Sequence, residues 1–180
     1  MCESDDVGPR TRVWAFSHVR EGAVVGADCN LGEHVFIEEG ARVGNGVTVK
    51  NGVQVWDRVT IEDDAFIGPN AVFTNDLRPR AFLKRSPSEL VPTVVRRGAT
   101  IGANATVVCG VTIGTEAFVA AGAVVLSDVP AHGLVVGNPG RPAGWVCTCA
   151  TPLPPSLACG ECGRRFRLVD AVSGLEPVPS

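Results

Sequence analysis

Aliphatic residues recur at every sixth position along most of this chain. From Val13 to Ile67 each sixth residue is Val, Ile or Leu, Phe73 follows in phase, and the step resumes at Val95 and continues to Val125. All sixteen hexads that these aliphatic residues open carry Ala, Val, Ser or Cys at their fifth position. The fourth position is Gly, Asp or Asn in twelve of the sixteen, and these residues tolerate a positive φ. Each hexad is therefore predicted to form a short strand with one bulky and one small inward side chain, followed by a turn.

A six-residue period of this kind is typical of a parallel β-helix in which three hexads complete one coil. Sixteen hexads give about five coils, and a spacing of about 4.8 Å between stacked strands makes the column about 25 Å tall. The predicted fold class is all-β, which agrees with 21 glycines and a single methionine. The period does not decide the hand, because hexapeptide helices are exceptions to the crossover rule. Several outward positions are apolar and suggest packing between subunits: Val24, Phe36, Phe66, Val72, Phe118 and Val124.

One insertion interrupts the period. Phe73 and Val95 are 22 residues apart, which is not a multiple of six, so residues 76–94 are predicted to leave the column as a loop. Long loops within a regular repeat are usually functional. This loop contains a basic cluster suited to phosphate oxygens, made of Arg78, Arg80, Lys84 and Arg85. The alternative is a solvated loop whose charges only maintain solubility.

Beyond Trp145 the six-residue period is gone, and four cysteines follow within sixteen residues. Cys147 and Cys149 form a C-x-C motif, and Cys159 and Cys162 form a C-x-x-C motif. Four thiolates can enclose one tetrahedral zinc ion, which would fold a segment too short to have its own core. Disulfides or free thiols are the alternatives. The chain is thus divided into a β-helix domain at 1–145, a zinc-ribbon-like tail at 146–170 and a flexible C-terminus at 171–180.

Charge and hydropathy exclude several classes of partner. The chain has 16 Lys and Arg against 19 Asp and Glu, a net charge of −3, which argues against binding nucleic acid or an anionic membrane. No run of 18 apolar residues occurs, and the acidic start differs from the basic and then apolar start of a signal peptide. We therefore expect a cytoplasmic protein.

Six segments of the repeat resemble one enzyme family. They are VWAFSHV, CNLGEHVFIEEG, VTVKNGVQVWDRVTIEDDAFIGPNAVFTNDLRPR, RRGATIGANATVVCGVTIG, AAGAVVLSDVP and VVGNPGRPAGW. The resemblance is to the hexapeptide-repeat N-acetyltransferases of nucleotide-linked 3-amino sugars. It implies a left-handed β-helix, a homotrimer with active sites between neighbouring subunits, acetyl-coenzyme A as donor and a sugar amine as acceptor. The FTND-x-x-PR segment is closer to the group that acts on dTDP-linked 3-amino-3,6-dideoxyhexoses than to the group acting on UDP-linked uronates.

The resemblance also suggests roles for individual residues. Asn75 matches the asparagine that orients the sugar amine beside the thioester, although a turn asparagine at the base of the loop is the alternative. Asp76 could help to collect the proton. The remaining candidates are Arg78, Arg80, Glu62, Asp64 and His34 for the nucleotide sugar, and Ala121, Gly122 and Arg141 for coenzyme A. Acidic turn residues are common on any surface, and His34 can be explained by its turn position alone.

A histidine base is not expected. The three histidines are His18, His34 and His132, and none follows Phe73, where related O-acetyltransferases place a catalytic histidine. An amine is a nucleophile once neutral, so it does not need the base that an alcohol needs. If the sugar amine titrates like an α-amino group, roughly a tenth to a fifth is neutral at pH 7. The alternatives are a sugar O-acetyltransferase and a noncatalytic β-helix that uses its tail for interactions; a carbonic anhydrase lacks the required histidines.

Overall fold

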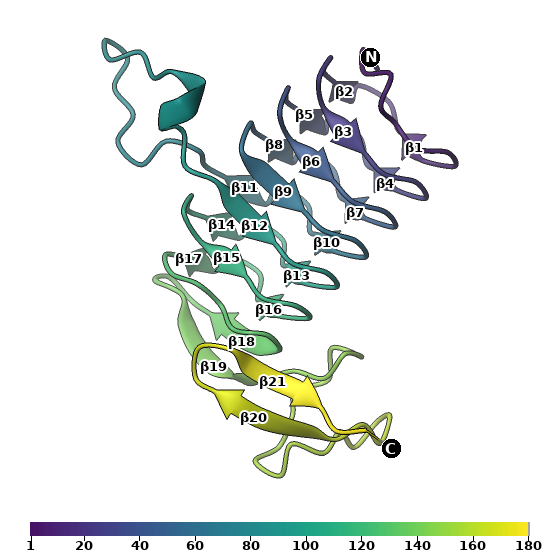
Figure 1. Ribbon diagram of the computed structural model, residues 1–180, viewed down its shortest axis with the longest axis vertical. Coiled ribbons are helices and arrows are strands. Elements are labelled where there is room, and N and C mark those ends of the chain that lie inside the picture. The colour runs from purple at the N-terminus through teal and green to yellow at the C-terminus, as the bar shows by residue number, and fades with distance from the viewer. Residues whose placement is uncertain (180) are drawn as a thin grey trace.

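The computed structural model describes residues 1–179, most of which form a three-sided column of short parallel strands (Figure 1). The first face contains β1 (Arg12–Val13), β4 (Asn30–Leu31), β7 (Thr48–Val49), β10 (Phe66–Ile67), β13 (Thr100–Ile101), β16 (Phe118–Val119) and β18 (Gly133–Val136). The second face contains β2 (His18–Val19), β5 (Phe36–Ile37), β8 (Gln54–Val55), β11 (Val72–Phe73), β14 (Thr106–Val107) and β17 (Val124–Val125). The third face contains β3 (Val24–Val25), β6 (Arg42–Val43), β9 (Val59–Ile61), β12 (Thr93–Val95) and β15 (Thr112–Ile113).

The chain passes around three corners in each coil. We call them the first corner, from the first to the second face, the second corner, from the second to the third face, and the third corner, from the third to the first face. In Figure 1 the strands of the third face lie nearest the viewer and run from left to right as the column descends, which makes the winding left-handed. The all-β parallel β-helix predicted from the period is confirmed.

The predicted inward positions form the core. In most strands of two residues the second residue is buried and the first faces outward, as in His18–Val19 and Phe36–Ile37. The small residue at the fifth position is buried as well, for example Ala65 and Ala99. Stacked strands pair with an offset of 18 residues, as Val13 does with Leu31, so each bulky aliphatic side chain packs on its equivalent in the next coil.

The corners require left-handed backbone, as the fourth position of each hexad predicted. Gly, Asp and Asn adopt positive φ there, and so do Phe16, His34, Arg58 and Glu116. Among the sixteen fourth positions, only Asp128 is not in this conformation. The repeat therefore imposes positive φ even on side chains that disfavour it, because the close stacking of the coils leaves the corner no other path.

The column begins earlier than the hexad series that starts at Val13. Val7 forms a parallel bridge with Val25, and Cys2 forms one with Val19, so residues 1–11 add a further partial coil. Val7 lies six residues before Val13 and is therefore in phase.

The predicted loop leaves the column at the second corner, between β11 and β12. Phe66 pairs with Thr100, an offset of 34 residues instead of 18, so the insertion adds 16 residues to one coil. The loop spans 74–92 and not 76–94, because Thr93 is already buried and paired with Val59. It contains a short 3-10 helix, η1 (Pro87–Glu89).

The tail is more ordered than predicted. The strand β19 (Arg141–Trp145) pairs antiparallel with β18, and β20 (Phe166–Asp170) forms an antiparallel hairpin with β21 (Gly174–Pro177). The flexible C-terminus expected at 171–180 is thus wrong for the hairpin; Ser180 lies outside the described residues. Leu175 explains the difference, because its side chain is buried in the tail core and its N–H donates to the carbonyl of Ala131, 3.1 Å away.

Candidate active site and cysteine cluster

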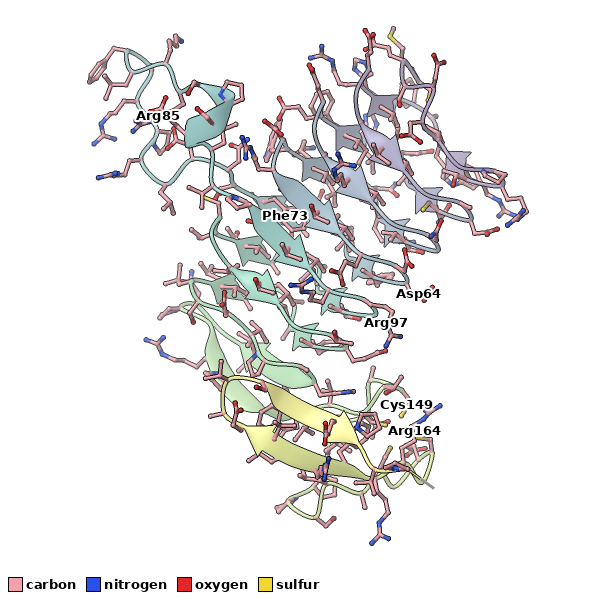
Figure 2. The ribbon with its side chains drawn as sticks, in the orientation of Figure 1. Asp64, Phe73, Arg85, Arg97, Cys149 and Arg164 are labelled. Carbon is pink, nitrogen blue, oxygen red and sulfur yellow. The ribbon has the colours of Figure 1, made fainter. Side chains whose placement is uncertain are left out.

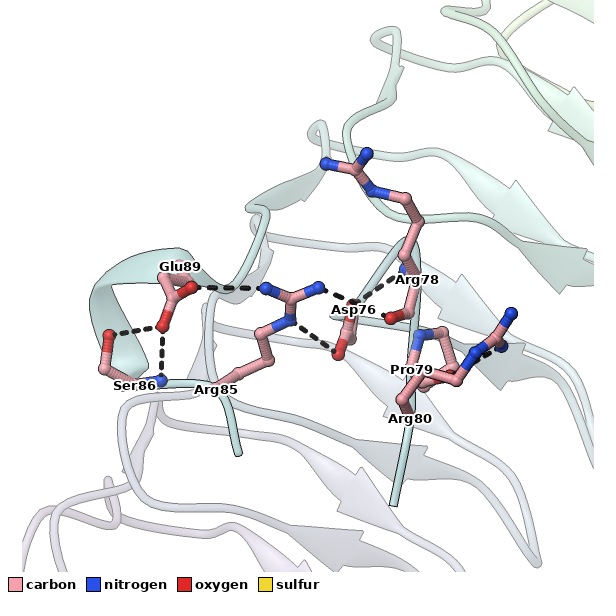
Figure 3. Close-up of polar contacts among 7 residues, drawn as sticks. All are labelled: Asp76, Arg78, Pro79, Arg80, Arg85, Ser86 and Glu89. Carbon is pink, nitrogen blue, oxygen red and sulfur yellow. Dashed lines mark hydrogen bonds and ion pairs between the residues drawn. The ribbon is translucent and has the colours of Figure 1, made fainter. Parts of the chain in front are cut away.

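Arg85 organises the loop at the second corner (Figure 3). Its guanidinium lies 3.5 Å from Asp76 Oδ2 and 3.3 Å from Glu89 Oε1, and it donates to the carbonyl of Arg78 at 3.4 Å. Glu89 also accepts a 2.8 Å hydrogen bond from the N–H of Ser86. One arginine of the predicted basic cluster is therefore held by carboxylates of its own loop, whereas Arg78 and Arg80 remain exposed.

Replacement of Arg85 is expected to loosen this loop without unfolding the column. In Arg85→Ala, Asp76 and Glu89 lose their shared cation, so hydrogen exchange of residues 76–89 should become faster while that of the β-strands stays the same. Lys84→Ala is the matched control, because Lys84 is exposed and makes none of these contacts. Equal exchange in both variants would show that Arg85 does not order the loop.

Asn75 lies where the loop begins. Its main-chain carbonyl accepts a 2.9 Å hydrogen bond from the N–H of Val91, which closes the base of the loop. Its side-chain Nδ2 lies 3.5 Å from the carbonyl of Asp57 in the preceding coil. With Nδ2 directed at this carbonyl, Oδ1 is the free end of the amide, and within residues 1–179 no donor contacts it. Oδ1 can thus accept a hydrogen bond from a ligand.

Asp76 is held differently. Its Oδ1 accepts a 2.8 Å hydrogen bond from the N–H of Arg78, and Oδ2 faces Arg85. A carboxylate held in this way helps to order the loop. Its role in collecting a proton stays a prediction.

The other predicted substrate residues lie at different corners. Glu62 and Asp64 are at the third corner, on the side of the column away from the loop, as the positions of Asp64 and Arg85 in Figure 2 show. Glu62 forms a 2.6 Å ion pair with Arg96 and accepts a 3.0 Å hydrogen bond from the N–H of Arg97. One chain therefore brings Asn75, Asp76, Arg78 and Arg80 together but does not bring Glu62 or Asp64 to them.

His34, Ala121 and Gly122 lie at the first corner, separated from the loop by the second face. His34 has a φ of 58° and stacks on Phe16 with ring centroids 5.0 Å apart. Ala121 and Gly122 follow β16 in a C-terminal coil. Arg141 is exposed at the start of β19. The sequence-predicted site is thus distributed over all three edges of the column.

No histidine occupies the second corner in residues 1–179. His132 is at the third corner, where it is buried, and its Nδ1 lies 3.0 Å from the carbonyl of Val146. Burial lowers the pKa of His132, which favours its neutral form. His18 projects from the second face, with its Nε2 2.9 Å from Glu3. Within the described residues of one chain, no imidazole therefore lies beside Asn75.

Two contributors to the site were missed in the sequence. Arg85 was grouped with the phosphate-binding candidates, although its i,i+4 spacing from Glu89 and the S-x-x-E sequence at Ser86 could have indicated its structural role. Trp56 was not singled out. Its indole N–H donates to the carbonyl of Phe73 at 3.0 Å, immediately before the loop, and only the stacking of adjacent coils brings them together.

The four tail cysteines converge as predicted. Their Sγ atoms all lie within 4.8 Å of one another, with Cys147 3.4 Å from Cys162 and Cys149 3.6 Å from Cys159. These separations are too long for disulfides, and all seven cysteines are free thiols. A tetrahedron with Zn–S bonds of about 2.3 Å has edges of about 3.8 Å. The sulfur set therefore fits one metal ion.

The cysteine cluster is joined to the end of the column. Cys147, Cys159, Phe166 and Leu175 form a small buried core. The ring of Phe166 lies 4.7 Å from that of His132 in the column. A cavity of about 330 Å³ remains between the last coil and the tail, lined in part by Val129, Trp145 and Ala171. The tail thus covers the C-terminal end of the prism.

Comparison with known proteins agrees with this architecture. The family described as "Bacterial transferase hexapeptide (six repeats)" matches residues 40–75 and 92–127, and the hexapeptide repeat of succinyl-transferase matches 22–55. The dTDP-3-amino-3,6-dideoxy-alpha-D-galactopyranose 3-N-acetyltransferase of Aneurinibacillus thermoaerophilus is 45% identical over 96% of this chain and 90% of its own length. This chain is a hexapeptide-repeat acetyltransferase.

Solved structures of other hexapeptide-repeat acetyltransferases share the fold. The acetyltransferase domain of PglB from Neisseria gonorrhoeae, in complex with acetyl coenzyme A, is 22% identical with a TM-score of 0.59, covering 70% of this chain and 54% of that one. Serine acetyltransferase of the same organism is 25% identical with a TM-score of 0.50, and the match covers 62% of this chain and 42% of that one. Within residues 1–179, this acetyltransferase has no helix long and apolar enough to cross a membrane.

Proposed function

We propose that this protein transfers the acetyl group of acetyl-coenzyme A to the 3-amino group of a dTDP-linked 3-amino-3,6-dideoxyhexose. The 45% identity to an enzyme of that name over nearly the whole chain supports the substrate class. The observation that carries the chemistry is Asn75, whose amide oxygen is free at the base of the loop. Within residues 1–179 the second corner itself supplies no imidazole, which fits an amine, a nucleophile that needs no such base, better than an alcohol.

The reaction needs orientation more than proton abstraction. The neutral amine attacks the thioester carbonyl carbon, the resulting tetrahedral intermediate collapses with cleavage of the C–S bond, and the thiolate leaves. Asn75 Oδ1 accepts an N–H of the amine and so directs the nitrogen lone pair at the carbonyl. The amine proton goes to solvent or to the departing thiolate, which leaves an amide and a thiol. Asp76 is a further candidate for this proton.

A second chain is part of the proposed site. Arg78 and Arg80 belong to the second corner, whereas His34, Ala121 and Gly122 belong to the first. Residues at two edges of one column can face a single ligand only if the first corner of one subunit meets the second corner of its neighbour. This arrangement is supplied by a homotrimer with active sites between subunits. In it, Ala121, Gly122 and Arg141 contact coenzyme A. Glu62 and Asp64 lie at the third corner, outside this interface, so their predicted contact with sugar hydroxyls has no place in this arrangement.

The tail is proposed to hold one zinc ion. Cys147, Cys149, Cys159 and Cys162 would be its ligands, and the spacing of their Sγ atoms supports this. The ion would neutralise thiolates that are partly buried and replace the core that so short a segment lacks. The β-helix at 1–145 and this tail then form two units with different roles, one catalytic and one covering the column end.

A thiol-release assay tests the proposed activity. With acetyl-coenzyme A as donor, we expect thiol release with dTDP-linked 3-amino-3,6-dideoxyhexoses and much less with UDP-linked 3-amino sugars. The corresponding 3-hydroxy sugars serve as controls for O-acetylation. Turnover of alcohols without turnover of any 3-amino sugar would replace this proposal with an O-acetyltransferase.

A further inference from the structure

The second face has one irregular junction, between β8 and β11, directly before the loop. The neighbouring pairs, β5 with β8 and β11 with β14, each have two register partners, whereas β8 and β11 share only one. Elsewhere on this face, the residue after a strand donates its main-chain N–H to the carbonyl that ends the strand of the next coil, as Glu38 does to Val55 at 2.9 Å. Within residues 1–179, the main-chain N–H of Trp56 makes no such bond to Phe73. The backbone ladder is thus interrupted two residues before Asn75.

The indole of Trp56 takes the place of the missing bond. Its Nε1–H donates to the carbonyl of Phe73 at 3.0 Å, so this carbonyl of a buried residue still has a partner. The indole is itself held, because it packs against the column core and its ring lies 5.7 Å from that of Phe36. Trp56 therefore ties the end of β11 to the preceding coil at the point where the chain leaves the column.

The same corner also holds the side chain of Asn75. The carbonyl of Asp57, the residue after Trp56, faces Nδ2 of Asn75 at 3.5 Å. On the C-terminal side, Thr74 donates its N–H to the carbonyl of Val107 at 3.2 Å, and its Oγ1 accepts the N–H of Cys109 at 2.9 Å. The segment that carries the Asn75 amide is thus held from the coils on both sides.

We propose that Trp56 is a positioning residue for the transfer reaction, acting through the carbonyl of Phe73 to fix the direction of Asn75 Oδ1. This inference rests on the proposed function for the role of Asn75, and Trp56 touches no reacting atom in it. A group that orients a nucleophile must itself be held to within about 0.5 Å, and hydrogen bonds from surrounding residues supply that restraint. Here the restraint comes from an indole, because the main-chain ladder does not reach the carbonyl of Phe73.

Trp56→Phe tests this role, because it keeps an aromatic ring at this place but removes the N–H. We expect kcat for the dTDP-linked 3-amino sugar to fall about tenfold, with KM for acetyl-coenzyme A unchanged. This loss is smaller than the factor of about 10² for a fully misplaced group, since Asp57 still faces the amide. Trp14→Phe is the matched control: it removes an indole N–H that donates to Asn30 at 2.7 Å on the first face, and it should keep the native kcat. A native kcat in Trp56→Phe, or an equal loss in Trp14→Phe, overturns the proposal.

Combination with Asn75→Ala separates positioning from a general structural effect. If Trp56 acts through Asn75, Trp56→Phe should change kcat less than about twofold in the Asn75→Ala background, because no amide is left to direct. A loss of about tenfold in both backgrounds would mean that Trp56 acts independently of Asn75, and would refute the positioning role.

Hydrogen exchange gives a readout that does not depend on activity. The N–H of Val91 bonds to the carbonyl of Asn75, so its exchange should be faster in Trp56→Phe than in the native protein or in Trp14→Phe. Unchanged exchange at Val91 contradicts the restraint. Faster exchange without acetylation of any 3-amino sugar would support the restraint and refute the proposed function. Acetylation with independent losses from Trp56→Phe and Asn75→Ala would do the reverse.

Discussion

Asn75→Ala is expected to lower kcat for the 3-amino sugar by about 10²-fold and to change KM little. The amide oxygen orients the amine in the reactive geometry, and misplacement of a reacting group by about 1 Å can cost this factor. The column should remain intact, because Asn75 is half-buried outside the core and its loop-closing hydrogen bond to Val91 is made by the main chain. Steady-state kinetics with acetyl-coenzyme A and the dTDP-linked sugar, together with a melting curve, provide the measurement.

Asn30→Ala is the control for this prediction. Asn30 lies in β4 on the first face, away from the loop, where its side chain accepts a 2.7 Å hydrogen bond from Trp14. The kcat of Asn30→Ala should equal that of the native enzyme. If Asn75→Ala retained full activity, the alternative interpretation of Asn75 as a turn residue would hold.

Removal of the tail metal is expected to have the largest effect on stability. Without the ion, nothing links the four Sγ atoms, and the small core around Cys147, Cys159, Phe166 and Leu175 loses the bonds that replace a larger core. Loss of a structural metal costs several kcal/mol, which corresponds to a decrease in melting temperature of about 10 °C for a chain of this size. A chelator at equilibrium, or the substitution Cys147→Ser, should produce this decrease and accelerate hydrogen exchange in residues 146–179.

Cys2→Ser controls for the loss of a thiol as such, since Cys2 is exposed and distant from the cluster in the sequence. It should retain one equivalent of zinc per chain by elemental analysis, as the native protein does. A native protein that purifies without metal and melts at the same temperature as Cys147→Ser would refute the metal site.

Much of the fold could be predicted from the six-residue period, because each hexad determines its own strand and turn. Each hexad repeats one bulky inward side chain, one small inward side chain and one residue with left-handed backbone. Val25 and Ala65 could therefore be placed in the core without knowledge of any distant contact. The end of the loop was missed by two residues because the aliphatic step resumes only at Val95, whereas strand pairing with Val59 already buries Thr93. The hairpin was missed because β20 and β21 are stabilised by Ala131 and His132 of the column, which lie about forty residues earlier in the chain.

The candidate site was less predictable. Motif similarity selected Asn75, and the sequence supplied the arginines, but which arginine is free depends on the folded loop. Only the structure shows that Arg85 lies between Asp76 and Glu89 while Arg78 and Arg80 are exposed. It also shows that Glu62 already has Arg96 as a partner at another corner.

The sequence alone determined the β-helix, the existence of the insertion and the convergence of four cysteines, because each follows from spacing along the chain. The tertiary structure alone decided which corner each candidate occupies and which neighbouring coils share a surface. Residues 18 positions apart become direct neighbours on a face, whereas residues six apart are turned to a different face. That geometry places Trp56 against the carbonyl of Phe73, next to the base of the loop, and leaves Glu62 at another corner.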